Sequence, residues 1–252
     1  KMIEEEKTTI SKISKSELRT HKAEELENLP AVVQKWLKNS GIIGKKEIKK
    51  VWVSQKAKMR MKPEQENWQE AKAEQWVNLE EPSFVWVVKM KMFGFLNIKG
   101  RDKFKDGQGE MLIKLGSLFN IVNEKGPKID EGSLQRFLGE LVWYPSFAFS
   151  EFIEWQEIDS LTAKATMNYK GSFGSGIFYF NENGDFTKFS TLRFMGNNQE
   201  SEKHEWLIEV DDYSIFEGIK VPSKMKATWK LSNKNWTWLK LEIVDLKYNS
   251  NL

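Results

Sequence analysis

Residues 224–231 read Lys-Met-Lys-Ala-Thr-Trp-Lys-Leu and alternate polar and apolar side chains over their whole length. Met225, Ala227, Trp229 and Leu231 fall on one side of the pattern, and lysine or threonine falls on the other. Successive side chains of a β-strand point to opposite faces of the sheet, so a period of two indicates a strand. A strand with one apolar and one charged face is typical of an antiparallel sheet that faces water on one side.

The same period recurs along most of the chain. Alternation or short apolar runs predict further strands at residues 51–53, 84–92, 98–104, 110–115, 163–170, 177–180, 186–195, 206–210 and 236–247. The apolar phase of the last strand shifts between Trp238 and Leu239, which predicts a β-bulge. The segments 106–109 and 181–185 are rich in turn residues and indicate hairpins. We therefore expect roughly nine to eleven sequential strands in a mainly β (α+β) fold, a curved antiparallel half-barrel wrapped round one or two helices.

Two helices interrupt the strand pattern. The first is expected from Pro30 to Gly41, since proline suits the first helical turn and glycine ends a helix. The second is expected at residues 133–144, with Ser133 as N-cap and Pro145 ending the run. Residues 1–28 are polar, and we expect them to be a loosely packed N-terminal segment. No linker divides the rest, so residues 29–252 are expected to form a single β domain.

Composition excludes several classes of function. The 252 residues carry 39 Lys and Arg against 36 Asp and Glu, a balance that gives no overall footprint for nucleic acid. Cysteine is absent, which excludes disulfides, thiolate metal sites and cysteine nucleophiles. The sequence begins at Lys1, and we expect that a signal peptide, a membrane anchor or a tag preceded it.

Recognisable catalytic motifs are missing from the sequence. Of the two histidines, His21 falls in the segment expected to be weakly structured, and His204 falls in a polar stretch typical of a solvated surface. The glycines of residues 171–176 lie between two strands rather than before a helix, which favours a turn over a phosphate loop. We accordingly predict no catalytic residue, no metal site and no cofactor.

One polar constellation is harder to explain by packing. At 100° per residue, Arg136, Glu140 and Trp143 gather on the side of the second helix opposite to its aliphatic stripe. If that side is exposed, Arg136 and Glu140 form a surface ion pair worth about 0.5 kcal/mol. If the concave side of the sheet covers it, the three residues line an internal cleft together with aromatic side chains of the sheet.

A family resemblance extends over most of the chain, from about residue 29 to residue 248. The segments Leu29-Pro30, 73–75, 82–86, 100–102, 107–111, 136–145 and 218–222, with Trp155 and Trp229, match the pattern of an uncharacterised bacterial family. That family is a domain of unknown function, often preceded by a membrane segment or signal, and it is similar in fold to the lipoprotein carriers LolA and LolB. The resemblance implies a half-barrel closed by helices over an apolar cavity, in a periplasmic or membrane-anchored protein that binds a hydrophobic ligand.

We therefore expect a lipid, an acyl chain or a lipoprotein to bind between the sheet and the helix at residues 133–144, to a protein that is a monomer. The expected ligand-binding residues are Gln75, Trp86, Met90, Met92, Arg101, Arg136, Glu140, Trp143 and Trp229, with Arg136 meeting a carboxylate or phosphate head group. An envelope protein without a ligand ranks close behind. An enzyme that uses Glu140, Arg136 and Asp102 on a small substrate ranks well below both.

Overall fold

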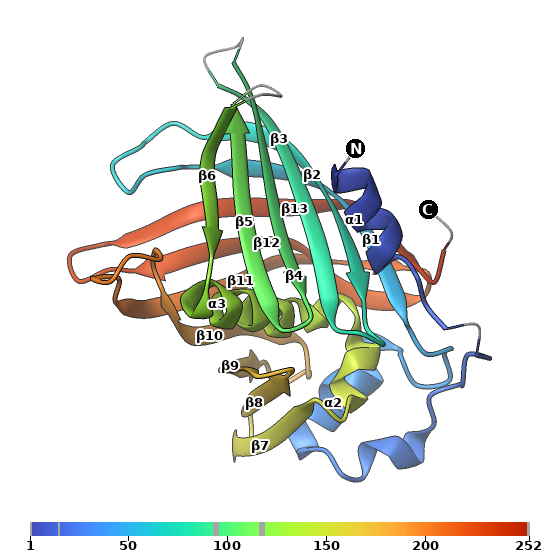
Figure 1. Cartoon of the computed structure of the whole chain (residues 1–252). Helices are drawn as coiled ribbons and strands as arrows, with labels where there is room; N and C mark the ends of the chain where they lie inside the picture. Colours follow the sequence, from blue (N-terminus) through green and yellow to red (C-terminus); the bar gives the residue numbers. More distant parts are fainter. Residues whose placement is uncertain (1, 15, 93–95, 116–118, 251–252) are drawn as a thin grey trace.

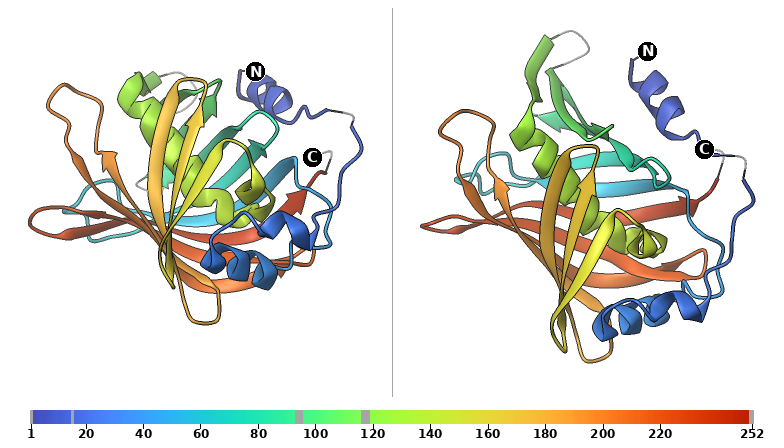
Figure 2. Two further views of the ribbon diagram at one scale, coloured as in Figure 1. Left: turned by 90° about the horizontal axis from the view of Figure 1, so that it is seen from below. Right: turned by 60° about the horizontal axis from the view of Figure 1, so that its bottom comes forward.

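In the computed structural model, which describes residues 2–14, 16–92, 96–115 and 119–250, thirteen strands form one sheet (Figure 1). The strand order is β6-β5-β4-β3-β2-β1-β13-β12-β11-β10-β9-β8-β7. Successive strands are therefore neighbours, except β6 and β7, which lie at opposite edges of the sheet. At the centre β1 pairs antiparallel with β13 and joins the two halves. The sheet curves into a half-barrel, which confirms the predicted fold class (Figures 1 and 2).

The strands agree with the alternation of the sequence. Their bounds are β1 Lys50–Met59, β2 Gln69–Asn78, β3 Ser83–Met92, β4 Leu96–Lys105, β5 Gln108–Leu115, β6 Phe119–Lys125, β7 Ile153–Asp159, β8 Thr162–Tyr169, β9 Ser172–Phe180, β10 Phe186–Phe194, β11 Lys203–Phe216, β12 Ile219–Lys230 and β13 Asn235–Tyr248. Thr237 pairs with Thr228 and Leu239 with Ala227, so Trp238 is the extra residue of the predicted bulge. The strands at 69–78, 119–125 and 153–159, which were not predicted, account for the higher count.

In the described residues, three α-helices and three 3-10 helices accompany the sheet: α1 Met2–Ile10, η1 Ala23–Leu26, α2 Ala31–Ser40, α3 Pro127–Gly139, η2 Glu140–Trp143 and η3 Pro145–Phe149. Helix α2 follows Pro30 and ends at Gly41, whose φ of 77° is left-handed, as predicted. The helix expected at residues 133–144 begins earlier, at Pro127, so Ser133 is not its N-cap. Pro127 suits the first helical position because it has no backbone N–H to leave without a partner and its φ is already helical, and it marks the true start of the helix.

Helix α3 lies in the concavity of the sheet (Figure 2). Its buried face belongs to the main hydrophobic core. Its apolar side chains, Leu134, Phe137 and Leu138, are fully buried. A side chain at Gly139 would bring a Cβ to 2.9 Å from Ile208 and 3.0 Å from Phe189, so this glycine lets the helix approach β10 and β11 closely. We call the side of the sheet that faces α3 the inner face, and the opposite side the outer face.

The N-terminal segment corrects the expectation that residues 1–28 pack loosely. Helix α1 packs on the outer face of β2 and β3, where Ile10 joins a small core with Trp76, Val85 and Val87. Leu26 belongs to the main core, and His21 is 1 % exposed. In the described part of the chain, no helix has both the length and the apolar character needed to cross a membrane.

Candidate functional site on the inner face

Arg136 on α3 and Glu140, the first residue of η2, are directed into the half-barrel. The Arg136 guanidinium donates to Asp102 Oδ2 at 2.8 Å, to Glu140 Oε1 at 2.8 Å and to Gln75 Oε1 at 3.1 Å. Gln75 in turn donates to Glu140 Oε2 at 2.6 Å. The side chains of Arg136 and Glu140 are 11 % and 8 % exposed, so the side of the helix opposite its aliphatic stripe is covered by the sheet. The interpretation as an exposed surface pair is therefore wrong.

The charges of this network are set by burial and by one another. Burial raises the pKa of Asp102 above its usual range, although Arg136 opposes that shift. Burial also lowers the pKa of Arg136, but Glu140 and Asp102 outweigh it, and the net shift is upward. One guanidinium thus faces two carboxylates, and three of its N–H groups already have acceptors.

Aromatic rings complete the surroundings of Arg136. Its guanidinium carbon lies 4.7 Å from the ring centre of Trp86 and 4.9 Å from that of Phe84. The Trp86 indole donates to Gln55 Oε1 at 2.9 Å, so this ring is held on the inner face by its own polar partner. Trp86 and Gln75 therefore belong to the site where the sequence placed them.

A second guanidinium, from Arg193 on β10, was not predicted. Its central carbon lies 4.7 Å from the ring centre of Trp206 and 5.9 Å from that of Trp229. Among the described residues it has neither a carboxylate in ion-pair range nor a hydrogen-bond acceptor. Burial and the nearby Arg136 lower the pKa of Arg193 to about 10. A Cβ at Gly132 would sit 2.9 Å from Arg193 Nε, so this glycine makes room for the guanidinium beneath α3.

Tryptophans on three neighbouring strands continue the inner face beside Arg193. Trp206 pairs with Trp229 and Trp229 with Trp236 across β11, β12 and β13, and the bulge adds Trp238. The indole N–H groups of Trp206, Trp236 and Trp238 are buried and have no acceptor among the described residues. We call Arg193, Trp206, Trp229, Trp236 and Trp238 the arginine–tryptophan cluster. Of these, the sequence had predicted only Trp229.

A compositional signal could have revealed Arg193. The chain has five arginines, Arg19, Arg60, Arg101, Arg136 and Arg193, among 39 basic residues. A guanidinium tolerates burial and stacks on aromatic faces better than an ammonium does, so a rare arginine within an apolar strand marks a special environment. The first four donate to carboxylates or a backbone carbonyl, which leaves Arg193 as the exception.

The remaining predicted residues are scattered. Met90 is buried in the main core, and Met92 ends β3 with a side chain that lies outside the described residues. Trp143 is on η2 and donates to the carbonyl of Pro222 at 3.1 Å. Arg101 lies on the outer face, where it meets Glu110 at 2.8 Å beneath α1. The structure therefore brings Gln75, Trp86, Arg136 and Glu140 together and separates Arg101 from them.

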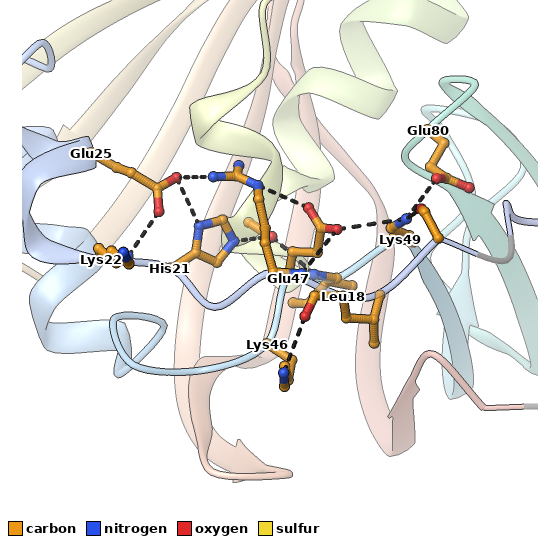
Figure 3. Close-up of polar contacts among 12 residues, drawn as sticks. Leu18, His21, Lys22, Glu25, Lys46, Glu47, Lys49 and Glu80 are labelled. Atoms are coloured by element: carbon orange, nitrogen blue, oxygen red, sulfur yellow. Dashed lines mark hydrogen bonds and ion pairs between the residues drawn. The ribbon is translucent and has the colours of Figure 1, made fainter.

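A second polar cluster ties the N-terminal segment to η3 (Figure 3). His21 Nε2 forms a short hydrogen bond with Ser146 Oγ, and His21 Nδ1 lies 3.2 Å from Glu25 Oε2. Arg19 holds Glu25 at 2.5 Å and Glu47 at 3.0 Å. His21, expected in a weakly structured segment, is instead buried and stacks on Phe149 with ring centres 4.7 Å apart.

Serine, histidine and a carboxylate in hydrogen-bonded sequence also occur in hydrolase triads. Here Ser146, His21 and Glu25 instead form a structural clamp between chain segments. Ser146 Oγ also accepts the backbone N–H of Ile48 at 3.0 Å, and the residue is only 8 % exposed. A hydroxyl held from two sides connects three chain segments. Burial lowers the pKa of His21, which keeps its ring neutral near pH 7. Among the described residues, no three His, Asp or Glu are grouped to hold a metal ion.

The chain was compared with curated proteins, solved structures and protein families. No curated protein matches the chain. It is similar to the crystal structure of a LolA superfamily protein from Nitrosomonas europaea, at 10 % identity and a TM-score of 0.46 over 88 % of this chain and 93 % of that one. It is also similar to a β-barrel-like protein with a domain of unknown function, DUF1849, from Brucella abortus, at 10 % identity and a TM-score of 0.29 over 80 % and 98 %. The model of a family of unknown function, DUF6544, matches residues 19–241, and the chain belongs to that family.

Proposed function

We propose that the inner face of the half-barrel binds an amphipathic ligand, an apolar chain that ends in a carboxylate or phosphate. The observation that carries this proposal is the environment of Arg193, a guanidinium stacked on tryptophan without an acidic partner. Arg193 is half-buried, and partly withdrawing a charge from water without a counter-charge is costly, so such a group favours an anion. A guanidinium donates two parallel hydrogen bonds to an oxyanion, which suits this head group.

The tryptophans supply the apolar part of the proposed site. An indole ring has a large apolar surface and one N–H donor, so it contacts an acyl chain and can donate near its polar end. Ligand sites are commonly lined by aromatic side chains with a few placed polar groups. The arginine–tryptophan cluster has that composition, with three indole donors that no described residue accepts.

The structure changes which arginine is assigned to the head group. Arg136 faces Asp102 and Glu140, and these two carboxylates would repel an approaching anion. We therefore assign head-group binding to Arg193 and a positioning role to Arg136. The enzymatic alternative is not favoured, since both oxygens of Glu140 already accept hydrogen bonds from Arg136 and Gln75.

The test is the binding of a fluorescent fatty acid with a free carboxylate, compared with its alcohol analogue. We expect the fatty acid to bind more tightly, and Arg193→Gln to weaken its affinity by roughly 10–100-fold, since hydrogen bonds to a charged group are worth about 1.5–3 kcal/mol. The matched control is Arg60→Gln, because Arg60 stacks at 4.4 Å on Trp68 on the outer face. Organic extracts of the purified protein, measured by mass spectrometry, should contain a lipid acid.

Two results would overturn the proposal. One is equal affinity of Arg193→Gln and the unaltered protein for the fatty acid. The other is the absence of fatty-acid binding together with lipid-free extracts from several preparations, which would favour the envelope protein without a ligand. We also propose an extracytoplasmic location, supported by the family resemblance of residues 136–145; finding the protein in the cytoplasmic fraction of its host would contradict it.

A further inference from the structure

The outer face of the sheet carries a row of lysines that crosses five adjacent strands. Lys56 pairs with Lys72, Lys72 with Lys89, Lys89 with Lys99, and Lys99 with Lys114, from β1 to β5. Directly opposed residues of antiparallel strands point to the same face, with Cβ atoms about 4.5–5.5 Å apart. We call these five residues the lysine row. It lies across β1–β5, which run side by side in Figure 1.

The continuation of the row shows what is unusual about it. On β13, β12 and β11 the same line continues as Glu242, Lys224 and Asp212, so that acidic and basic side chains alternate. Lys224 and Asp212 form an ion pair at 3.3 Å. Within the part of the chain that the structure describes, none of the five residues of the lysine row forms an ion pair. One half of the line is therefore neutralised, and the other half is not.

A groove of about 1150 Å³ runs beside this row. Lys58, Lys91 and Lys240 also line the groove. Ala57 and Ala71 line it as well, although their side chains belong to the main core on the inner face. Eight lysines line the groove, and Glu70, Asp211 and Glu242 are its acidic residues. The chain as a whole has a net charge of only +3, so the positive charge is concentrated here.

The lysines are close enough to repel one another. Burial, followed by the charges of Lys89, Lys7 and Lys114, lowers the pKa of Lys99. Like charges placed directly opposite in a sheet are destabilising, and here the unfavourable arrangement repeats over four strand pairs. A bound polyanion would reverse the sign of this interaction.

We propose that the groove binds a linear polyanion with repeating phosphate groups, of the type of polyphosphate. Strands in a sheet are about 4.8 Å apart, which is wider than the distance between adjacent phosphorus atoms joined by one bridging oxygen. The lysine row therefore presents ammonium groups at a spacing that alternate phosphates of an extended chain can meet. An ammonium binds phosphate as a point charge with three donors and requires no fixed orientation.

Two other anionic partners fit the groove less well. Single-stranded nucleic acid is bound through aromatic rings that stack on its bases, whereas the Trp68 ring in this groove is covered by Arg60 at 4.4 Å and by Lys240 at 4.9 Å. A membrane surface is flat and is commonly penetrated by apolar side chains. Among the described residues, the large apolar side chains that are exposed to solvent, such as Ile215 and Phe173, lie outside the groove.

The experiment measures the affinity for long-chain inorganic polyphosphate by fluorescence anisotropy over a range of salt concentrations. Neutralising four phosphates predicts a slope of log K against log salt of about −3, if the coefficient for single-stranded nucleic acid is used. We expect the double variant Lys72→Gln/Lys89→Gln to lose about tenfold in affinity at low salt and to reduce the slope by roughly half. The charge-matched control is Lys170→Gln/Lys203→Gln, whose lysines pair with Asp106 and Glu131 and lie outside the groove.

Three outcomes would overturn the proposal: equal losses in the row variant and the control, tripolyphosphate binding as tightly as the long chain, or binding to phosphatidylglycerol vesicles without binding to polyphosphate. The exposed lysines should be replaceable without loss of the far-ultraviolet circular dichroism spectrum or a lower Tm. Fatty-acid binding should be unchanged in the row variant, because the arginine–tryptophan cluster lies on the opposite face.

Discussion

The inner and outer faces of the sheet treat charge differently. On the inner face, Arg136 is held by Asp102, Glu140 and Gln75, while Arg193 stacks on tryptophan without an acid. On the outer face, the lysine row keeps like charges side by side, where they reach solvent. A charge inside the half-barrel is costly when it has no partner, whereas a charge outside can remain unpaired at small cost. An inner charge without a partner is therefore the stronger indication of a ligand.

The largest expected effect separates the two inner arginines. Arg136→Met should destabilise the fold by about 3–5 kcal/mol, because it leaves the carboxylates of Asp102 and Glu140 buried without their counter-charge. Arg193→Met should change stability by no more than about 1 kcal/mol, since it removes a charge that has no acidic partner and loses only its stacking on tryptophan. Urea unfolding followed by circular dichroism measures both. Equal losses would show that Arg193 has a structural partner after all.

The next effect concerns pH and compares His21 with Asp102. Burial lowers the pKa of His21 below the value of about 6.5 that the unfolded chain has, so the unfolded state binds more protons as the pH falls. The contribution of His21 to stability is complete above about pH 6.5 and is lost as the pH falls below it. Asp102 has the opposite effect, because burial raises its pKa in the folded state. As the pH falls from the folded pKa of this carboxyl to its unfolded pKa, the folded state binds the proton first, and the free energy of unfolding rises.

We therefore expect His21→Gln to be less stable than the unaltered protein at pH 7.5, and the difference to shrink by about 1 kcal/mol at pH 5. The same urea experiment at several pH values measures this. Ser146→Ala is the control, because it removes the hydroxyl of the clamp and leaves the titrating ring in place. A constant difference between His21→Gln and the unaltered protein at all pH values would contradict the shift.

The sheet could be predicted well from the sequence because the alternation that marks a strand is visible within that strand alone. Residues 224–231 show in their own alternation which side chains face the core, and the bulge at Trp238 is a change of phase that can be read within one strand. The covered side of α3 was predicted for a similar reason, since helical periodicity places Arg136 opposite the apolar stripe. Trp143 lies beyond the end of α3, on η2, where it donates to the carbonyl of Pro222 instead.

The missed features depend on strand pairing over long distances. Arg193 is recognised as unpaired only when β10 is placed beside β11 and beneath α3, and the sequence does not state that register. The bond between His21 and Ser146 joins residues 125 positions apart. The assignment of Arg101 to the site failed because alternation tells which residues share a face, but not which face is the inner one.

The smallest expected effect compares the two halves of the outer line. Lys72→Glu places an acid between Lys56 and Lys89 and should stabilise the fold by about 0.5–1 kcal/mol, because two like-charged cross-strand pairs become opposite. Lys224→Glu makes the reverse change between Glu242 and Asp212 and should destabilise it by a similar amount. Both differences should shrink in 0.5 M salt, which screens exposed charges. If Lys72→Glu instead lowers the Tm at low salt, the lysine row is stabilised by a partner within the fold, and the reason for assigning it a polyanion is removed.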